Sequence, residues 1–474
     1  MKLTFIGGAK TVTGVCYLLE TANQKILIDC GLFQGKKELE KKNYEPLTFE
    51  PSDIDAAIVS HAHLDHIGRL PRLIKGGFAG RIFATPPTID FARLILEDSV
   101  KILEEKARKA GIVPFFDESD VEEVTRHFAT LDYYQRWEIL PGIFLTFHNA
   151  GHVLGSAIIE LEVEDPSLLR RAGLRRASKK IVFSGDLGHP FMPLLPAPDF
   201  LAAADYVIVE STYGDRNHES PEEIQGIIEK VIEDTIAARG TLMIPSFALE
   251  RAQQLIYHLN NLVEQKRIPS VPIFIDSPLA TRITDVYKTY IAYYNKKTQA
   301  QIAAGDDIFK FPGLRFTHSS QESKAINDLP APKIIIAGSG MSQGGRILHH
   351  EARYLGEPQN TLLLVTYQAE GTLGRKIVEG AEKIRILDQE IDIKAKIVKI
   401  SGYSSHADQK FLMDWLRHFH KSDYTEKAGS GDGVKKIFVA QGEEKSAKVL
   451  AGLVNDELGI RAEVPEPGEK VELE

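Results

Sequence analysis

The sequence predicts an α/β protein in which one domain interrupts another, and three observations support this prediction. Short strand-like runs, separated by Gly and polar turns, occupy about the first 200 residues. From about residue 209 to 389, longer strands and helices alternate regularly. From residue 390 to 474, short strands return. We therefore expect a discontinuous first domain, residues 1–208 and 390–474, and an inserted second domain, residues 209–389.

The first part of the interrupted domain contains short apolar runs that we interpret as strands. Residues 88–107 are instead expected to form a long amphipathic helix, because their apolar positions recur at helical spacing. Three strands end at polar or metal-binding residue types: Asp29, His61 and, just past the strand 180–184, Asp186. Functional residues often lie at such ends, so we expect the site here. The expected strands are 3–6, 15–20, 25–29, 56–59, 81–84, 144–148, 156–161 and 180–184.

The inserted segment alternates strand and helix. A helix is expected from Ser220 to about Arg239, because Ser220-Pro221-Glu222-Glu223 forms a capping box and Gly240 suits a helix end. Further helices are expected from about Leu249 and after Gly344. This alternation predicts a mainly parallel sheet flanked by helices. The expected strands are 241–245, 271–275, 333–337 and 361–365, followed after the insertion by 395–400 and 436–440.

The composition indicates the class of protein and the cellular compartment in which we expect it. Of 474 residues, 43% are hydrophobic and 26% charged, as in ordinary soluble globular proteins. No run of about 18 apolar residues occurs, so we expect no membrane partner. The N-terminal residues lack the apolar core of a signal peptide, and the two cysteines, Cys16 and Cys30, lie in strand-like runs. A reducing cytoplasm is therefore the expected location.

The net charge of −9 does not itself indicate nucleic-acid binding, because phosphate contacts depend on local patches. The clearest basic patch has two interpretations, a surface that follows a phosphate backbone or a solvated hairpin tip. A Gly-rich segment, residues 422–435, is expected to be a flexible loop. The patch consists of Arg170, Arg171, Arg175, Arg176, Lys179 and Lys180.

The most informative stretch is Ser60-His61-Ala62-His63-Leu64-Asp65-His66, which follows the apolar strand 56–59. His61 and His63 are two residues apart, so at a strand end both side chains leave the same face. Neutral imidazoles and a carboxylate suit a divalent ion of the zinc type. The alternative is a solvated polar loop, which rarely carries so dense a cluster.

Two more candidate ligands lie farther along the chain, and each follows a strand beside a glycine. They are His152 after Gly151 and Asp186 after Gly185. Taken alone, each is typical of a turn or capping residue, but together with the histidine cluster they give six ligands for two adjoining sites. Two ions about 3.5–4 Å apart lower the pKa of a shared water and hold both oxygens of an in-line displacement.

These residues resemble the metallo-β-lactamase superfamily in type and order. The resemblance implies an αββα sandwich for the first domain and two divalent ions, zinc in the first place and manganese as the alternative. It also implies three ligands of one ion, two ligands of the other, a bridging carboxylate and one residue that orients a ligand. By this resemblance, one ion is held by His61, His63 and His152, and the other by Asp65 and His66. Asp186 is the bridging carboxylate, and Asp29 is the residue that orients a ligand.

A histidine appears where the first domain resumes: His406, in Ser404-Ser405-His406. A neutral leaving group needs a proton donor, and histidine has a suitable pKa. Glu210 ends a strand, and from there it could hydrogen-bond His406 and hold it protonated. The alternative is that His406 only begins a helix, with Ser404 or Ser405 as its cap.

Glu210 and His406 match the first acidic motif and the second motif of the β-CASP branch of the superfamily, whose members process nucleic acids. The resemblance covers nearly the whole chain and is strongest to bacterial and archaeal RNA nucleases related to the cleavage-and-polyadenylation endonuclease subunit. It implies that residues 209–389 form a β-CASP domain covering the metal site, with single-stranded RNA as substrate and DNA as the alternative.

The inserted domain also contains candidate RNA contacts. A Gly-rich turn, residues 338–346, follows a strand and opens a helix, so its backbone N–H groups and Arg346 could bind an anion. A plain tight loop is the alternative. With the residues that the resemblance adds, the candidate RNA contacts are Ser246, Arg251, Ser339, Ser342 and Arg346.

One departure from the family pattern concerns the third motif, which supplies a further metal ligand near the C-terminus, usually histidine in RNA enzymes. Gln441 occupies that place in residues 438–443. An amide oxygen is a poor substitute for imidazole on zinc. We therefore expect a weaker second metal site and low or altered activity.

Together these features predict a zinc-dependent ribonuclease. A hydroxide shared by the two ions would attack phosphorus and His406 would protonate the leaving oxygen, with Glu210, Asp65 and Asp186 completing the catalytic set. One alternative is a nucleic-acid-binding paralogue with little or no activity, favoured by Gln441. The other is a small-molecule metallo-hydrolase, against which the insertion and His406 count. The C-terminal strands could pair between subunits, which would give a homodimer.

Overall fold

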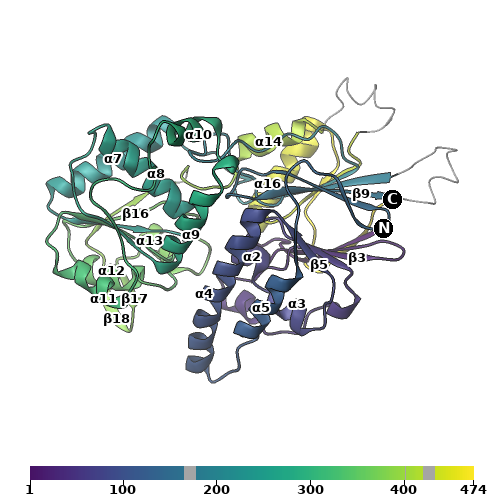
Figure 1. Ribbon diagram of the computed structural model, residues 1–474, viewed down its shortest axis with the longest axis horizontal. Coiled ribbons are helices and arrows are strands. Elements are labelled where there is room, and N and C mark those ends of the chain that lie inside the picture. Colours follow the sequence, from purple (N-terminus) through teal and green to yellow (C-terminus); the bar gives the residue numbers. More distant parts are fainter. Residues whose placement is uncertain (165–177, 401, 420–432) are drawn as a thin grey trace.

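The computed structural model describes residues 1–164, 178–400, 402–419 and 433–474 (Figure 1). Four arginines of the basic patch and most of the segment 422–435 lie outside these residues. The two remaining patch residues, Lys179 and Lys180, lie on a strand. Lys179 Nζ donates to the carbonyl of Leu473 (3.0 Å), and Lys180 Nζ forms an ion pair with Glu160 (2.8 Å).

The interrupted domain is built on two seven-stranded sheets. The first has the order β22-β1-β2-β3-β4-β5-β6, and the second the order β21-β20-β11-β10-β9-β8-β7. Both sheets include strands from the C-terminal segment, so the domain is discontinuous in sequence. The strands of the first are β1 Lys2–Gly7, β2 Cys16–Glu20, β3 Lys25–Ile28, β4 Ala56–Ile58, β5 Arg81–Ala84, β6 Phe128–Thr130 and β22 Lys470–Glu472. Those of the second are β7 Trp137–Leu140, β8 Ile143–Asn149, β9 Ala157–Glu164, β10 Ser178–Phe183, β11 Tyr206–Val209, β20 Lys436–Val439 and β21 Ala462–Glu463.

The two sheets pack face to face, and helices cover their outer faces (Figure 1). Phe5 of β1 and Phe438 of β20 meet between the sheets, with ring centroids 5.2 Å apart. Apolar side chains of α3, α4 and α5 cover the first sheet, and those of α14 and α16 cover the second. This confirms the αββα sandwich. The helices are α1 Lys37–Lys41, α2 Leu64–Ile67, α3 Leu70–Lys75, α4 Pro86–Ala110, α5 Glu118–His127, α14 Gln409–Arg417 and α16 Glu444–Leu453.

The inserted domain contains a six-stranded sheet of order β14-β13-β15-β12-β16-β19, in which all neighbouring strands are parallel. Helices α7, α8 and α9 pack on one face, and α12 and α13 on the other, which confirms the predicted arrangement. The strands are β12 Thr241–Pro245, β13 Ile273–Asp276, β14 Leu314–Phe316, β15 Lys333–Ala337, β16 Thr361–Leu364 and β19 Lys396–Lys399. The helices are α7 Pro221–Ala237, α8 Arg251–Glu264, α9 Pro278–Thr289, α10 Lys296–Ala303, α11 Ser320–Ala325, α12 Ile347–Tyr354 and α13 Leu373–Val378.

Two boundaries differ from the sequence-based expectation. Strand β19 pairs with β16, so this sheet continues past residue 389, where we expected the insertion to end. A hairpin, β17 Lys383–Ile386 and β18 Gln389–Asp392, also spans that position.

Helix α8 begins at Arg251 rather than near Leu249, because Glu250 has a φ of +69°, outside the helical region. The capping box of α7 is present as predicted.

The two domains meet along α4 and α9, which lie side by side (Figure 1). Arg282 of α9 forms an ion pair with Glu97 of α4 (2.6 Å), and the Tyr290 hydroxyl donates to Asp90 (2.6 Å). The chain leaves the first domain after β11 and returns before α14, and the two crossings touch through a bridge between Tyr213 and Asp408. Glu210 and His406 therefore lie close to the junction of the domains.

Three features concern the terminal strands, the cysteines and the helices of the described residues. Strands β21 and β22 are edge strands within one chain, so their pairing between subunits stays a prediction. Cys16 and Cys30 are free and buried. None of the helices in the described part of the chain has both the length and the apolarity to cross a lipid bilayer.

A buried carboxyl group of the inserted domain gives a stability prediction. Glu351 is fully buried, and the Ser342 hydroxyl donates to it (2.6 Å). Burial raises the pKa of Glu351 from 4.5 to about 7. The unfolded chain therefore releases this proton at a lower pH than the folded protein, and stability falls as pH rises from about 4.5 to 7.

We expect Glu351→Gln to stabilise the protein at pH 8, by about 2 kcal/mol more than at pH 5, because the amide cannot ionise. Calorimetric melting of both proteins at the two pH values measures this difference. Glu357→Gln on the surface of the same domain is the control. An equal gain at both pH values would contradict the prediction.

Candidate active site

The ends of β3 and β4 bring the first site residues together. Asp29 has a φ of +57°, and its carboxylate accepts hydrogen bonds from the backbone and hydroxyl of Ser60, both at 2.8 Å. The same carboxylate accepts a hydrogen bond from His66 Nδ1 (2.7 Å). Asp29 therefore fixes the turn and the orientation of His66, as a residue behind a metal ligand does.

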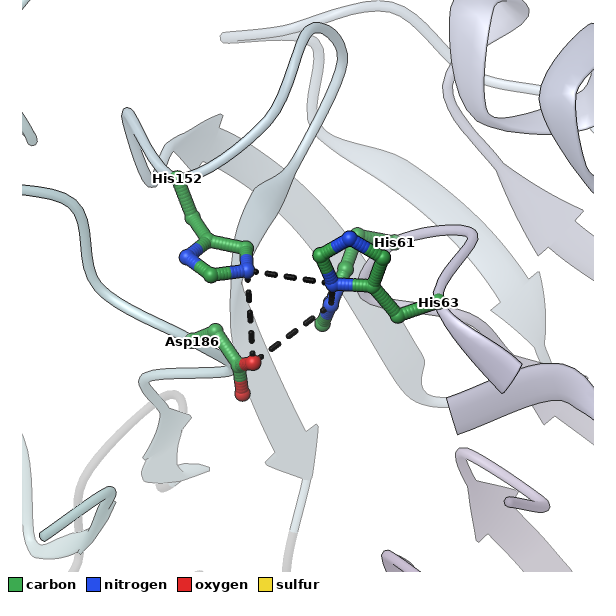
Figure 2. A group of neighbouring side chains, drawn as sticks. All are labelled: His61, His63, His152 and Asp186. Atoms are coloured by element: carbon green, nitrogen blue, oxygen red, sulfur yellow. Dashed lines mark hydrogen bonds and ion pairs between the residues drawn. The ribbon is translucent and has the colours of Figure 1, made fainter. Parts of the chain in front are cut away.

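Four donor atoms converge in front of this turn: His61 Nε2, His63 Nδ1, His152 Nε2 and Asp186 Oδ2 (Figure 2). The His63 nitrogen lies 3.0 Å from that of His61 and 3.2 Å from that of His152. The Asp186 oxygen lies 3.5 Å and 3.4 Å from the same two nitrogens. Tetrahedral bonds of about 2.0–2.1 Å give donor separations of about 3.3 Å. The donor set therefore fits a four-coordinate ion the size of zinc.

The electrostatics of this donor set also suit a cation. Burial lowers the pKa of His63 to about 3 and holds those of His61 and His152 well below the ordinary value, so the rings are neutral and offer lone pairs. Burial opposes ionisation of Asp186, but the positive charge of neighbouring His66 holds the pKa of Asp186 well below its usual range. His152 Nδ1–H donates to the carbonyl of Ser405 (3.2 Å), which leaves Nε2 free to bind an ion.

A second donor set shares Asp186. His66 Nε2 lies 3.2 Å from Asp186 Oδ1 and 3.9 Å from Asp65 Oδ2. Burial opposes protonation of His66, but the carboxylates of Asp186, Asp29 and Asp65 raise its pKa well above the ordinary value. Burial raises the pKa of Asp65 to about 6. The carboxylates of the second donor set therefore favour a positive charge there.

The side chain of Gln441 reaches into the second donor set. It follows β20 with a φ of +43°, and its Nε2 lies 3.0 Å from His66 Nε2. The same nitrogen donates a hydrogen bond to Asp186 Oδ1. The end of the amide thus lies where a fourth ligand would be expected, but with its hydrogens toward the carboxylate.

A histidine–glutamate pair lies beside the two donor sets. His406 Nδ1 is 3.1 and 3.2 Å from the two carboxylate oxygens of Glu210 and 3.8 Å from Asp186 Oδ2. Burial opposes protonation, but Glu210, Asp186 and Asp65 raise the pKa of His406 to about 9. Backbone N–H groups of Leu187 (2.8 Å) and Thr212 (3.3 Å) hold the Glu210 carboxylate in place. These carboxylates therefore favour the protonated form of the His406 ring at neutral pH.

Two of the candidate RNA contacts, Ser246 and Arg251, are buried near this site. The Ser246 hydroxyl donates to the carbonyl of Phe247 (3.0 Å). Arg251 Nη2 donates to the hydroxyl of Ser405 (2.7 Å), and its guanidinium lies 5.1 Å from the centre of the Tyr403 ring. Arg251 thus contacts the loop that carries His406.

The other three candidates belong to the turn 338–346. The Ser339 hydroxyl accepts from the backbone of Gln343 (3.0 Å), and Ser342 points to the buried Glu351. Arg346 Nη1 donates to Asp276 (2.7 Å) and to the hydroxyl of Thr317 (3.0 Å). These contacts hold the turn together, and RNA binding by these residues stays a prediction.

The structure gives roles to residues to which the sequence analysis assigned none. Ser60 links Asp29 to the histidine cluster, and His189 and His218 contact the loop that carries His406. His189 follows Asp186 by three positions and His218 follows Glu210 by eight. Their nearness to those residues in sequence is the one signal that could have indicated them.

Comparison with known proteins matches all parts of this architecture. Family models match a metallo-β-lactamase superfamily domain at residues 18–171, a Beta-Casp domain at 252–377 and a Zn-dependent metallo-hydrolase RNA specificity domain at 390–465. Ribonuclease TTHA0252 of Thermus thermophilus is 36% identical over 454 residues, which cover 96% of each chain. Transcription termination factor FttA of Methanosarcina mazei is 32% identical over 470 residues, which cover 97% of this chain and 70% of that one.

A solved structure shows the same fold. It is a protein of unknown function from Enterococcus faecalis V583, with a TM-score of 0.52, 12% identity and 99% coverage of both chains. The sandwich, the inserted parallel sheet and the matches along the chain agree with one another. The chain belongs to the β-CASP branch of the metallo-β-lactamase superfamily.

Proposed function

We propose that the protein is a metal-dependent ribonuclease that hydrolyses phosphodiester bonds in single-stranded RNA. The observation that carries the proposal is the four-atom donor set beside the His406–Glu210 pair at the junction of two domains. The membership of the chain in a branch of metal-dependent nucleases supports it, as do the relative named a ribonuclease and the RNA specificity domain model. The two free, buried thiols agree with a cytoplasmic setting.

The proposed cofactors are two divalent ions, with zinc as the preferred metal. His61, His63, His152 and Asp186 would hold the first ion, and the shared Asp186 with Asp65, His66 and Gln441 would hold the second. Such a pair supplies a nucleophile at neutral pH and stabilises the charge that develops on the phosphate. Asp29 keeps His66 in its orientation through the bond to Nδ1.

The residues around the ions have separate tasks. Glu210 engages His406 Nδ1, so the proton given to the leaving oxygen is the one on Nε2. The inserted domain reaches the site at Phe247, whose ring lies near that of His63, with ring centroids 6.4 Å apart. An aromatic ring at this place would help to orient an RNA strand beside the donor atoms.

An RNA cleavage assay tests the proposal. Metal-loaded protein is incubated with labelled RNA that is 5′-phosphorylated, 5′-hydroxylated or circular, with His63→Ala as the inactive control. We expect products that require the metal and the wild-type site. Binding without products would favour a nucleic-acid-binding paralogue, and activity on a thioester or lactam but not RNA would favour a small-molecule hydrolase.

The contact of Gln441 with both His66 and Asp186 leads to a prediction about metal content. The amide hydrogens satisfy Asp186 Oδ1 without an ion, and an amide that turned its oxygen inward would be a weak neutral ligand. We expect purified wild-type protein to keep about one tightly bound zinc per chain and Gln441→His to keep about two, because imidazole is the better ligand.

Elemental analysis after dialysis against a chelator measures the number of ions, independently of activity. Gln441→Ala is the control, because it removes the amide without supplying a ligand, and it should retain one ion. Equal occupancy of the second site in the wild type and in Gln441→His would contradict this role of Gln441.

A further inference from the structure

Three consecutive backbone carbonyls around His406 each accept a hydrogen bond from a histidine. His189 Nε2–H donates to Ser404 (3.1 Å), His152 Nδ1–H donates to Ser405 (3.2 Å) and His218 Nε2–H donates to His406 itself (2.9 Å). The donors come from three separate segments, so the loop is held from several sides.

The chemistry of His189 and His218 suits a structural donor. Burial lowers the pKa of His189 to about 3 and also lowers that of His218, so each ring is neutral with one N–H. His189 Nδ1 accepts from the backbone of Phe191 (3.3 Å), which places the hydrogen on Nε2. Both nitrogens of His189 are thus engaged by backbone groups, and the ring is not available to bind a metal ion.

The loop that carries His406 depends on such hydrogen bonds for its position. Residues 402–407 lie between β19 and α14 and form neither helix nor strand. A further contact comes from the inserted domain, where Arg251 donates to the hydroxyl of Ser405. The Glu210 bond orients the ring of His406 but not its backbone. A displacement of about 1 Å in a reacting group can lower a rate about 100-fold.

We propose that His189 and His218 are positioning residues, which hold the backbone at residues 404–406 so that the ring of His406 stays between Glu210 and the metal-binding residues. The inference rests on the proposed role of His406 as proton donor. It assigns no contact with RNA to either histidine. Their removal should therefore slow the step that needs the proton without weakening substrate binding.

Two substrates separate this role from a general loss of structure. RNA has a poor leaving group that needs a proton, whereas the nitrophenolate released from bis(4-nitrophenyl) phosphate does not. We expect His218→Ala and His189→Ala to lower kcat on RNA about 10- to 100-fold, with KM and metal content unchanged. The rate on bis(4-nitrophenyl) phosphate should change less than about 3-fold, and the glutamine variants, which keep a side-chain N–H, should restore most of the RNA activity.

A double-mutant cycle tests whether the effect passes through His406. In a His406→Ala background, His218→Ala should cause little further loss. His127→Ala, which removes a histidine of α5 that donates to the backbone carbonyl of Gly80 (2.7 Å), is the matched control and should leave the ratio of the two activities unchanged. Equal loss on both substrates, or a loss that adds to that of His406→Ala, would overturn the proposal.

Hydrogen–deuterium exchange gives a readout that does not depend on RNA cleavage. Backbone amides of residues 402–408 should exchange faster in His218→Ala and His189→Ala than in the wild type or the glutamine variants. Unchanged exchange would overturn the proposal whatever the enzyme cleaves. Wild-type protein that hydrolyses the nitrophenyl ester but not RNA would instead contradict the proposed function.

Discussion

His406→Ala is expected to lower the rate of RNA cleavage by about 10²- to 10⁴-fold, the usual contribution of a positioned general acid. The metal content should stay unchanged, because the donor atoms proposed for the two ions belong to other residues and His406 Nδ1 faces the Glu210 carboxylate. Single-turnover cleavage of labelled RNA, together with elemental analysis of the same preparations, measures the two quantities. An unaffected cleavage rate would show that His406 is not the proton donor.

The pKa of His406 adds a pH dependence to this prediction. An acid works only while it holds its proton, so activity should fall as pH rises through the pKa of His406, which the carboxylates raise to about 9. Ions bound by Asp186 and Asp65 would neutralise those two carboxylates, which leaves Glu210 as the main cause of the rise. Glu210→Gln should therefore move the alkaline limb of the kcat/KM profile to lower pH, measured between pH 6 and 10.

The residues of the four-atom donor set could be predicted from the sequence because each depends on a short local pattern. His61 and His63 follow β4, His152 follows β8 and Asp186 follows β10. Each side chain leaves a strand whose apolar residues mark it clearly. Strands β8 and β10 flank β9 in one sheet, and β4 belongs to the other sheet. The structure brings their donor atoms within 4.8 Å of one another.

The features that the sequence did not predict depend on contacts between distant segments. The bond from His218 to the carbonyl of His406 joins residues 188 positions apart, and that from His189 to Ser404 joins residues 215 apart. Neither histidine has a local pattern that distinguishes it from a surface residue. Strand β19 is another example, since its short run does not reveal which sheet it joins.

The hydrogen-bond partners of the candidate RNA-binding residues could not be predicted either, because they too come from distant segments of the chain. The sequence places Arg346 in a Gly-rich turn that suits an anion, but Asp276, which ends another strand, already accepts its hydrogen bond. The side chains around Asp276 hold the pKa of that carboxyl far below its usual range, although burial opposes this. RNA that binds at this turn would share Arg346 with that carboxylate or use the backbone N–H groups.

Asp186→Asn is expected to have the largest effect on metal binding. One carboxylate oxygen of Asp186 faces His61 and His152, and the other faces His66, so a single substitution alters both donor sets. The asparagine side chain has no negative charge, and its amide group would point hydrogens toward one of the two donor sets. Zinc affinity should fall by more than the roughly 10- to 100-fold that loss of an outer partner costs, and RNA cleavage should be lost with it.

Asp29→Asn is the matched control, because Asp29 orients His66 without facing the first donor set. It should weaken binding of the second ion by about 10- to 100-fold and affect the first ion less, because Asp29 reaches His61 only through the hydroxyl of Ser60. Competition with a coloured chelator measures both affinities, and melting curves verify that each variant is folded. If Asp186→Asn held zinc as tightly as the wild type, the ions could not be bound through this carboxylate. A carboxylate that faces both donor sets would serve both ions, so its loss should exceed that of any residue that faces one set alone.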